Sequence, residues 1–341
     1  MHGVTETTPA IHLVPRAVRE AREDRLSPLG TRAVDSRGRA EAEEPDELRT
    51  AFELDRDRIA HSKAFRRLKH KTQVFINPEG DHFVTRMSHT LQVTQIARSV
   101  ARALDVNEDL TEAICLGHDC GHTPFGHTGE AALSEYVEDG EWLHSAQGVR
   151  IFEVLEPRNL TWEVLDGIRA HTWRVQPPPH TAEGWVCRFA DRIAYLNHDL
   201  LDAVRAGILT PADLPDDVVR VMGPFSGGHW IGTMIRAVLD ESLRRGRVCM
   251  QADVLRAMQL MRDFMFERVY LRPESRAQAE RARRVIHDLV DFLRRNPDRI
   301  PASYQRVDDS VETRVIDYVA GMTDRFALNL HDQWFRPRGL V

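Results

Sequence analysis

The spacing of apolar residues limits what this 341-residue chain can fold into more than any other feature of its sequence. Between about residues 85 and 104, apolar side chains form one face of an amphipathic helix, at Leu91, Val93, Ile96, Val100 and Leu104. Similar helical patterns follow at about 107–117, 129–138, 144–156, 161–171, 182–206, 230–244, 251–271, 274–295 and 308–329. Because the sequence shows no sustained alternation of apolar and polar residues and no hairpin signature, we predict an all-α fold.

Composition divides the chain into an N-terminal arm and one larger domain. Residues 1–48 are polar and charged without a clear period, so we expect a flexible or partner-dependent arm. The run 52–75 predicts a helix followed by a turn. We expect residues 49–341 to form a single domain, with a metal-ligating core at about 55–205 and further helices at about 206–341.

Bulk composition argues against several classes of protein. A formal net charge of −6 gives no sign of an obligate nucleic-acid binder. The four cysteines form no CxxC pair, as is typical of reduced thiols in a cytoplasmic protein. The N-terminus lacks the apolar core of a secretory signal, and no stretch approaches the roughly 18 apolar residues of a membrane span. We therefore expect a cytoplasmic protein with no membrane partner.

The densest chemistry in the sequence lies between His118 and Glu130. This segment, HDCGHTPFGHTGE, holds three histidines and two carboxylates in 13 residues, which a surface loop rarely needs. Imidazole and carboxylate groups together suit a divalent metal ion. His118 and His122 are four residues apart and could share a helical face, although Gly121 and Pro124 limit how far a helix continues. We interpret the segment as part of a metal or catalytic site.

Two predicted helices carry polar residues that suit the same site. Arg86 and His89 are three residues apart and so share a face of the helix at 85–104. On the helix at 182–206, an otherwise apolar face carries three polar residues spaced four apart, Asp191, Tyr195 and Asp199. Arg192 lies beside this face. A carboxylate on such a face is costly unless it is paired or bound to a metal. Each residue alone could have an ordinary structural role, but together they indicate a site.

Taken together, these residues reproduce the H…HD…D pattern of the HD phosphohydrolase superfamily, with His89, His118-Asp119 and Asp191. The segments SKAFRRLKHKTQVF, DHFVTRMSHTLQV, GHDCGHTPFGHTGE and DYVAGMTDRFAL further resemble the bacterial deoxyguanosinetriphosphate triphosphohydrolase (dGTPase) family. The resemblance covers about residues 35–330 and is strongest at 55–200. It implies an HD-domain helical fold with additional C-terminal helices. It also implies a reaction in which a deoxynucleoside triphosphate (dNTP) and water give a deoxynucleoside and intact triphosphate.

The resemblance implies a role for each matching position. One such role is to hold a divalent metal, Mn²⁺ or Mg²⁺ with Fe²⁺ as an alternative. Its ligands would be His89, His118, Asp119 and Asp191. A catalytic His-acid pair would be His127 with Glu130, while His122 would contact the phosphates and His144 the region of the leaving oxygen. The phosphate contacts would be Arg86 and Arg192. The deoxyribose 3′-hydroxyl would be held by Tyr195 and Asp199, and the sugar and base would be bordered by Gln73 and Val74.

Three other hypotheses stay open at this stage. A different HD-family phosphohydrolase, such as a nucleoside 5′-monophosphatase, would release orthophosphate instead of triphosphate. A zinc peptidase is suggested by HDCGH, but the Glu that acts as general base in HExxH is replaced by Asp119. A regulatory protein that binds nucleotides or single-stranded DNA could use the basic runs 66–71 and 244–247. Relatives in the dGTPase family form oligomers, often hexamers, so the resemblance also implies a homo-oligomer.

Overall fold

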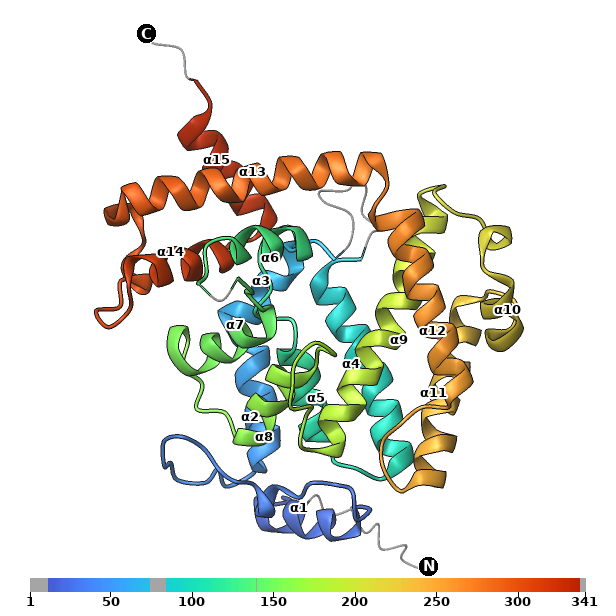
Figure 1. Cartoon of the computed structure of the whole chain (residues 1–341). Coiled ribbons are helices and arrows are strands. Elements are labelled where there is room, and N and C mark those ends of the chain that lie inside the picture. The colour runs from blue at the N-terminus through green and yellow to red at the C-terminus, as the bar shows by residue number, and fades with distance from the viewer. Residues whose placement is uncertain (1–11, 74–83, 139, 338–341) are drawn as a thin grey trace, which may run out of the picture.

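Helices make up the regular structure of the described residues, 12–73, 84–138 and 140–337, in the computed structural model (Figure 1). Within these ranges the extended contacts are two isolated bridges, Arg39 with Thr161 and Thr72 with Thr85. The prediction of an all-α fold is thus confirmed. None of the helices in this part of the chain has the length and apolar character that crossing a bilayer requires.

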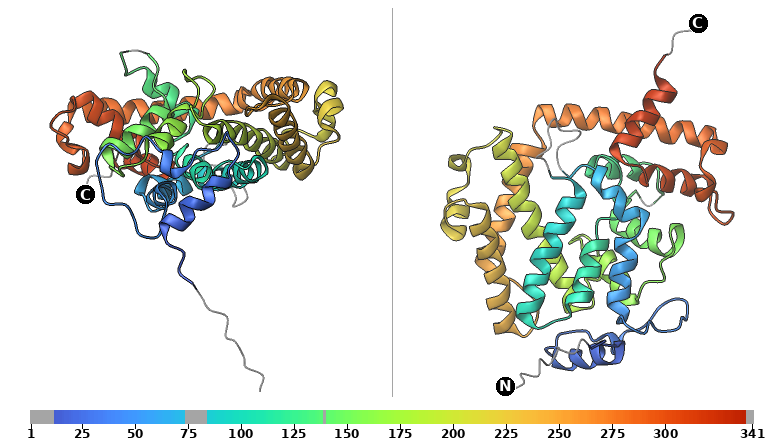
Figure 2. Two further views of the ribbon diagram at one scale, coloured as in Figure 1. Left: turned by 90° about the horizontal axis from the view of Figure 1, so that it is seen from below. Right: turned by 180° about the vertical axis from the view of Figure 1, so that it is seen from behind.

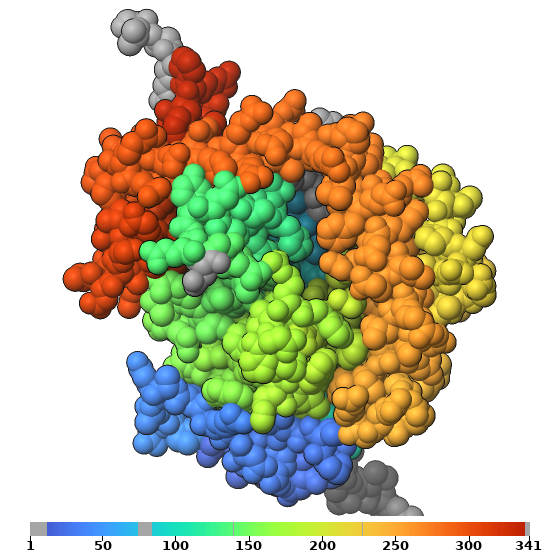
Figure 3. Space-filling view, viewed as in Figure 1, coloured from blue at the N-terminus to red at the C-terminus, as the bar shows by residue number. Residues whose placement is uncertain are grey.

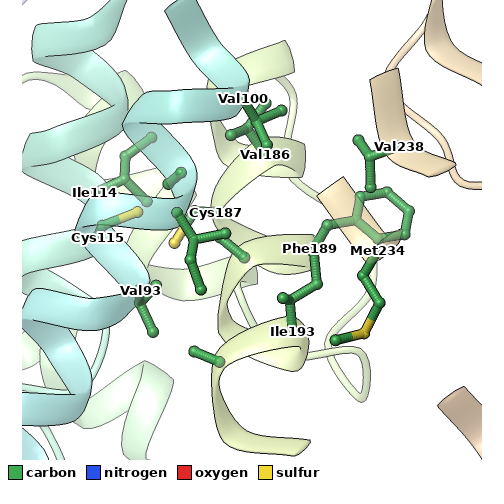
Figure 4. Packing of buried hydrophobic residues seen from close by; sticks show 14 of the residues in the cluster. Val93, Val100, Ile114, Cys115, Val186, Cys187, Phe189, Ile193, Met234 and Val238 are labelled. Atoms are coloured by element: carbon green, nitrogen blue, oxygen red, sulfur yellow. The ribbon is translucent and has the colours of Figure 1, made fainter. Parts of the chain in front are cut away.

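Four helices form the centre of the molecule: α2 (Ala51–Ala60), α4 (Arg86–Leu104), α5 (Glu108–Gly117) and α9 (Ala182–Arg205). Helix α4 packs on α5 and α9, and α5 also packs on α2. Their fully buried apolar side chains meet in Figure 4, among them Val93, Ile114, Cys115, Val186, Cys187 and Ile193. Burying each large apolar side chain contributes about 1.5–3 kcal/mol, so this contact fixes how α4, α5 and α9 lie relative to one another.

Two groups of helices flank this centre. On one side α11 (Gly227–Arg245) packs against α9 and α4, and α10 (Asp216–Met222) packs against α12 (Ala252–Met265). Helix α12 continues as one π-helical turn, Phe266–Tyr270. On the other side α7 (His144–Arg150) packs on α8 (Trp162–Ala170), which contacts α5 and α9. The central helices lie between these two groups, as Figure 2 shows.

A second hydrophobic cluster joins the C-terminal helices to the middle of the chain. It comprises residues of α13 (Pro273–Arg295), α14 (Val311–Ala320) and α15 (Asp324–Phe335) together with α6 (His127–Ser134). Leu133 of α6 and Ile286 of α13 are fully buried in it. Helix α13 runs across the top of the molecule in Figure 1. The additional C-terminal helices therefore pack on the segment that carries His127 and Glu130.

The segment that was expected to be an arm contacts the helical body through buried carboxylates. It includes a short helix, α1 (Arg16–Arg22). Thr31 donates to Glu183 at the start of α9 through its backbone N–H and its hydroxyl, both at 2.9 Å. Ser36 donates to Glu163 of α8 at 2.7 Å, and Arg39 pairs with the fully buried Asp55 of α2. These contacts hold residues 31–39 on the body, while flexibility and dependence on a partner stay predictions.

Two helices that the sequence pattern suggested as continuous are each divided in two. The helix expected within 52–75 ends with α2, and α3 (Lys63–Arg67) restarts because Ser62 accepts from the backbone N–H of Phe65. The helix expected at 308–329 is divided into α14 and α15, and Thr323 caps the second by accepting from the N–H of Phe326. A side-chain cap satisfies a free backbone N–H and so favours a new helix start. The spacing of apolar residues does not reveal such a cap.

Candidate active site

The four predicted metal ligands come from three helices of the central group. His89 lies on the first turn of α4, His118 and Asp119 directly follow α5, and Asp191 lies in the middle of α9. One ligand atom from each of His89, His118 and Asp119 lies within 4.8 Å of the others. The Oδ1 atom of Asp191 is 3.1 Å from His89 Nε2 and 3.9 Å from His118 Nε2. The packing of α4, α5 and α9 thus brings all four residues together.

The donor atoms of this group fit a divalent metal ion. His118 is fully buried, and its Nδ1–H donates to the carbonyl of Cys115 at 2.6 Å. This bond leaves the lone pair on Nε2, which is buried without a hydrogen-bond partner among the described residues. A histidine whose second nitrogen donates to a backbone carbonyl is the usual form of a metal ligand. Two imidazoles and two carboxylates are a donor set typical of a transition metal or Mg²⁺-like ion.

Asp119 connects this group to a cation and to a second histidine. Its Oδ2 accepts from Arg86 Nη1 at 2.9 Å, and its Oδ1 is 3.2 Å from His122 Nε2. Burial alone would raise the pKa of Asp119, but His118, Arg86 and His122 outweigh burial and hold it well below its usual range. The carboxylate is therefore ionised at neutral pH and able to act as a ligand.

A second set of residues lies next to Asp119 and centres on His144. The Nδ1 atom of His144 is 3.2 Å from Glu130 Oε1, which also accepts from the backbone N–H of His144 at 3.2 Å. The imidazole of His144 stacks on that of His122, with ring centroids 3.7 Å apart. Burial would raise the pKa of Glu130, but His144 outweighs it and lowers this pKa to about 2. Glu130 is thus a carboxylate that orients an imidazole.

This arrangement differs from the expected pairing of Glu130 with His127. His127 begins α6 and its side chain is exposed, with its ring centroid 6.4 Å from that of His144. In the described part of the chain Glu130 hydrogen-bonds with His144 and not with His127. The reason is that His144 starts α7 beside Glu130, a contact between residues 14 positions apart that local spacing does not reveal.

The predicted substrate contacts on α9 line up along one side of the site. Arg192 and Tyr195 are half-buried, while Asp199 is buried and accepts from the hydroxyl of Tyr270 at 2.6 Å. Burial raises the pKa of Asp199 to about 7. Gln73 lies beside Gly126, since its carbonyl oxygen is 3.7 Å from where a Cβ of Gly126 would stand. Val74 lies outside the described residues.

The molecular surface is hollowed on the face shown in Figure 3, beneath α13 and between the segment around residues 120–150 and α12. The residues described above come from the elements around this hollow.

Comparison with known proteins finds two family matches and several relatives. Residues 86–196 match the HD domain, and residues 248–333 match a phosphohydrolase-associated domain. A deoxyguanosinetriphosphate triphosphohydrolase-like protein of Caldanaerobacter subterraneus is 48% identical over 92% of this chain and 93% of its own. Proteins of the same name from Desulfatibacillum aliphaticivorans and Clostridium perfringens are 42% and 40% identical, over 94% and 92% of this chain and 98% and 95% of their own. The chain belongs to the dGTPase-like family of HD-domain phosphohydrolases.

Among solved structures, a hypothetical protein from Aquifex aeolicus is 22% identical, with a TM-score of 0.49. The match covers 83% of this chain and 68% of that one. In this dGTPase-like chain, the HD match begins with Arg86 and ends one residue after Tyr195, so it includes all four predicted metal ligands. The phosphohydrolase-associated match includes Tyr270 and reaches into α15.

Four residues contact the site but were not predicted from the sequence. His171 is buried, with its Nε2 3.0 Å from that of His144 and its ring centroid 5.1 Å from that of His118. Lys71 is buried and donates to the carbonyls of His122 and, at 3.1 Å, Ala320. Burial lowers the pKa of Lys71 to about 7. The other two are Tyr270, in the turn after α12, and Arg262 of α12; burial lowers the pKa of Arg192, and the charge of Arg262 lowers it further.

One of these residues carried a local signal. His171 follows Val164 and Ile168 on the apolar face of α8, where a polar residue is unusual. Lys71 lies in a basic run that gives no sign of burial. Tyr270 and Arg262 reach the site through the packing of α12 on α9, over a sequence separation of about 70 residues. That contact depends on tertiary structure alone.

Proposed function

We propose that this protein is a metal-dependent dNTP triphosphohydrolase, which converts dGTP or another dNTP and water to a deoxynucleoside and triphosphate. The observation that carries the proposal is the position of Asp119. One of its oxygens lies 3.5 Å from His118 and 3.2 Å from His122, and the other accepts from Arg86. The proposed metal ligands, the histidine group and an arginine therefore meet at one carboxylate, an arrangement suited to the hydrolysis of a phosphate ester.

The residues proposed to hold the metal are His89, His118, Asp119 and Asp191. A bound Mn²⁺ or Mg²⁺ would supply Lewis acidity, polarising a phosphoryl oxygen and offsetting its negative charge. Arg86 and Arg192 would bind phosphate oxygens through planar guanidinium groups, which suit bidentate contacts. His122, whose Nδ1 is buried without a partner among the described residues, would contribute a further contact to the phosphates.

We assign the proton transfer first to His144, because Glu130 orients it. Its Nδ1–H donates to the carboxylate, so Nε2, which lies 3.0 Å from His171 Nε2, is the atom left to hold or release a proton. In the reaction, a water oxygen bonds to the α-phosphorus as the water loses a proton, the bond from this phosphorus to the 5′-oxygen breaks, and the 5′-oxygen gains a proton. His127, exposed at the edge of the site, is the second candidate for delivering that proton.

The sugar end of the substrate would lie along α9. Tyr195 and Asp199 are one helical turn apart and face the site with Tyr270. We propose that Asp199 accepts from the 3′-hydroxyl and that Tyr195 stands where a ribose 2′-hydroxyl would be. Replacing Tyr195 by Ala should then relax the preference for dGTP over GTP, and an unchanged ratio of kcat/KM for the two would contradict this role.

A product assay tests the proposed function. Purified protein is incubated with each of the four dNTPs, singly and mixed, with Mn²⁺ or Mg²⁺, and the products are resolved by ion-exchange chromatography. We expect deoxynucleoside and intact triphosphate, with no turnover in Asp119→Ala. His144→Asn should reduce kcat by about 10²–10⁴-fold, the range for a general acid or base. A larger loss in His127→Asn would transfer the proton-transfer role to His127.

Two other outcomes would redirect the proposal. Orthophosphate as product would favour another HD-family activity, such as a 5′-nucleotidase. No turnover in any mixture, together with salt-dependent binding of single strands, would favour a regulatory protein that binds nucleotides or single-stranded DNA. The homo-oligomer, including a hexamer, and the cytoplasmic location stay predictions.

A further inference from the structure

A tryptophan outside the predicted site lies against one of its arginines. Trp173 belongs to the loop between α8 and α9, and its ring centroid is 4.3 Å from Cζ of Arg192. Both side chains are half-buried. A guanidinium at this distance from an indole face is attracted to it by a cation–π interaction.

The loop that carries Trp173 is itself attached to α9. The buried Arg188, one helical turn before Arg192, donates to the carbonyls of Thr172 at 2.6 Å and Val175 at 3.2 Å. The indole N–H of Trp173 donates to the carbonyl of Arg188 at 3.4 Å. The Trp173 ring also meets Phe189 edge to face, with centroids 5.3 Å apart. These contacts therefore hold the Trp173 ring in place beside Arg192.

Arg192 is a cation without a paired anion in the described part of the chain. Its Nε is buried and has no hydrogen-bond partner there, while Tyr195 and the carboxylate of Asp191 attract its charge. The nearby Arg262 adds positive charge. Because the guanidinium carbon lies over the Trp173 ring, the N–H groups at its outer edge are the part left to donate. Such an edge matches two oxygens of a phosphate group.

We propose that Trp173 is a positioning residue that holds the guanidinium of Arg192 in the orientation in which it binds the polyphosphate of the substrate. The identity of that substrate rests on the proposed function. The contact between the Trp173 ring and Arg192 does not depend on the proposed function, so the positioning role and the proposed function can be tested separately. His171, two residues earlier, anchors the same loop beside His118 and His144, which places Trp173 within reach of the phosphate-binding side of the site.

The test measures binding of inorganic tripolyphosphate to the full chain by calorimetry, with Mg²⁺ in excess over both. In Trp173→Leu, which keeps an apolar side chain but removes the π face, we expect Kd to rise about tenfold, or about 1.4 kcal/mol. Trp173→Tyr should restore most of the affinity. The matched control is Trp185→Leu, because Trp185 contacts Trp173 and stacks on Arg188 at 5.1 Å but not on Arg192. This control should change Kd by less than about twofold.

A double variant asks whether Trp173 acts through Arg192. If it does, Trp173→Leu added to Arg192→Gln should weaken binding no further, and with an accepted dNTP Trp173→Leu should raise KM more than it lowers kcat. Unchanged affinity in Trp173→Leu, equal weakening in Trp185→Leu, or additive losses would overturn the proposal. So would a wild-type protein that binds no tripolyphosphate. Release of orthophosphate from dNTPs would instead refute the proposed function and leave the binding test of Trp173 intact.

Discussion

At the scale of single residues, Gly121 shows how closely the backbone is packed behind the site. A Cβ at this position would be 2.0 Å from the carbonyl oxygen of His144 and 2.3 Å from the backbone nitrogen of Gly148, both in α7. We predict that Gly121→Ala displaces α7, lowers the free energy of unfolding by about 1–3 kcal/mol and reduces kcat. Urea unfolding and steady-state kinetics measure both.

The control for this substitution is Gly232→Ala in α11, where a Cβ meets nothing within 4 Å. Alanine should stabilise this helix by about 0.5–1 kcal/mol. Equal stability and activity of Gly121→Ala and wild type would show that α7 is not held in this way.

Asp199 makes a prediction about pH. Its burial raises its pKa to about 7 in the folded protein, whereas an unfolded carboxyl titrates near about 4. A raised folded pKa means that stability is highest below about pH 4 and falls as the pH rises toward about 7. We therefore predict that Asp199→Asn, which cannot ionise and can still accept from Tyr270, gains stability relative to wild type over this interval, by on the order of 2–4 kcal/mol.

Urea unfolding of both proteins between pH 4.5 and 8 measures this difference. Asp240→Asn, on α11, is the control, and its difference from wild type should be level over the same interval. A difference that does not change with pH for Asp199→Asn would show that the folded-state pKa is not raised.

The chemistry of single residues was more predictable than their partners. Imidazole and carboxylate types at His89, His118, Asp119 and Asp191 predicted a metal group, and three packed helices bring them together. The partner of Glu130 was not predictable, because His144 approaches it from another helix and His127 is nearer in sequence. His171 and Lys71 were not predicted for the same reason, because their contacts with His144 and His122 are tertiary.

At the scale of elements, apolar spacing predicted the helices better than their ends. The predicted helices at 85–104 and 182–206 correspond closely to α4 and α9, whose buried faces are long and regular. The breaks before α3 and α15 depend on the capping hydroxyls of Ser62 and Thr323. The π-helical turn at Phe266–Tyr270 was also unpredicted, although it places Tyr270 against Asp199.

The junction of α14 and α15 makes a prediction about coupling between elements. Asp324, the first residue of α15, accepts from the backbone N–H of Thr72 and of Phe125, both at 3.0 Å, and from the Thr72 hydroxyl. Phe125 has a φ of 63°, a strained conformation for a non-glycine residue. We predict that Asp324→Ala releases the loop before α6, lowers the free energy of unfolding by about 1–3 kcal/mol and lowers kcat.

The matched control is Asp332→Ala on the same helix, where the carboxylate is exposed and pairs with the exposed Arg336. This change should alter stability by less than about 0.5 kcal/mol and leave kcat unchanged. If the two variants behave alike, α15 does not support the site through Asp324.

At the scale of the whole molecule, the site lies where the two hydrophobic clusters meet. The larger cluster positions α4, α5 and α9, while the smaller one holds α6 against the C-terminal helices. Composition predicted one domain but not this division, because each cluster combines segments from distant parts of the chain. Residue Phe125, in the smaller cluster, lies only six positions after Asp119. Any change in how the clusters pack should therefore alter the distance between the metal group and Glu130.

The same arrangement makes metal binding a determinant of stability for the whole chain. A ligand that binds the folded state alone stabilises it by about 2.7 kcal/mol at 100 times its Kd, which corresponds to roughly 4 °C in Tm for a domain of this size. We predict that dialysis against a chelator lowers Tm by about this amount and that Mn²⁺ restores it. Asp119→Ala should abolish the metal-dependent shift, because it removes one of the four proposed ligands. Asp317→Asn, a buried carboxylate paired with Arg150, should keep the shift even if its Tm is lower. A metal-dependent shift of normal size in Asp119→Ala would place the ion elsewhere in the molecule and remove the main support for the proposed reaction.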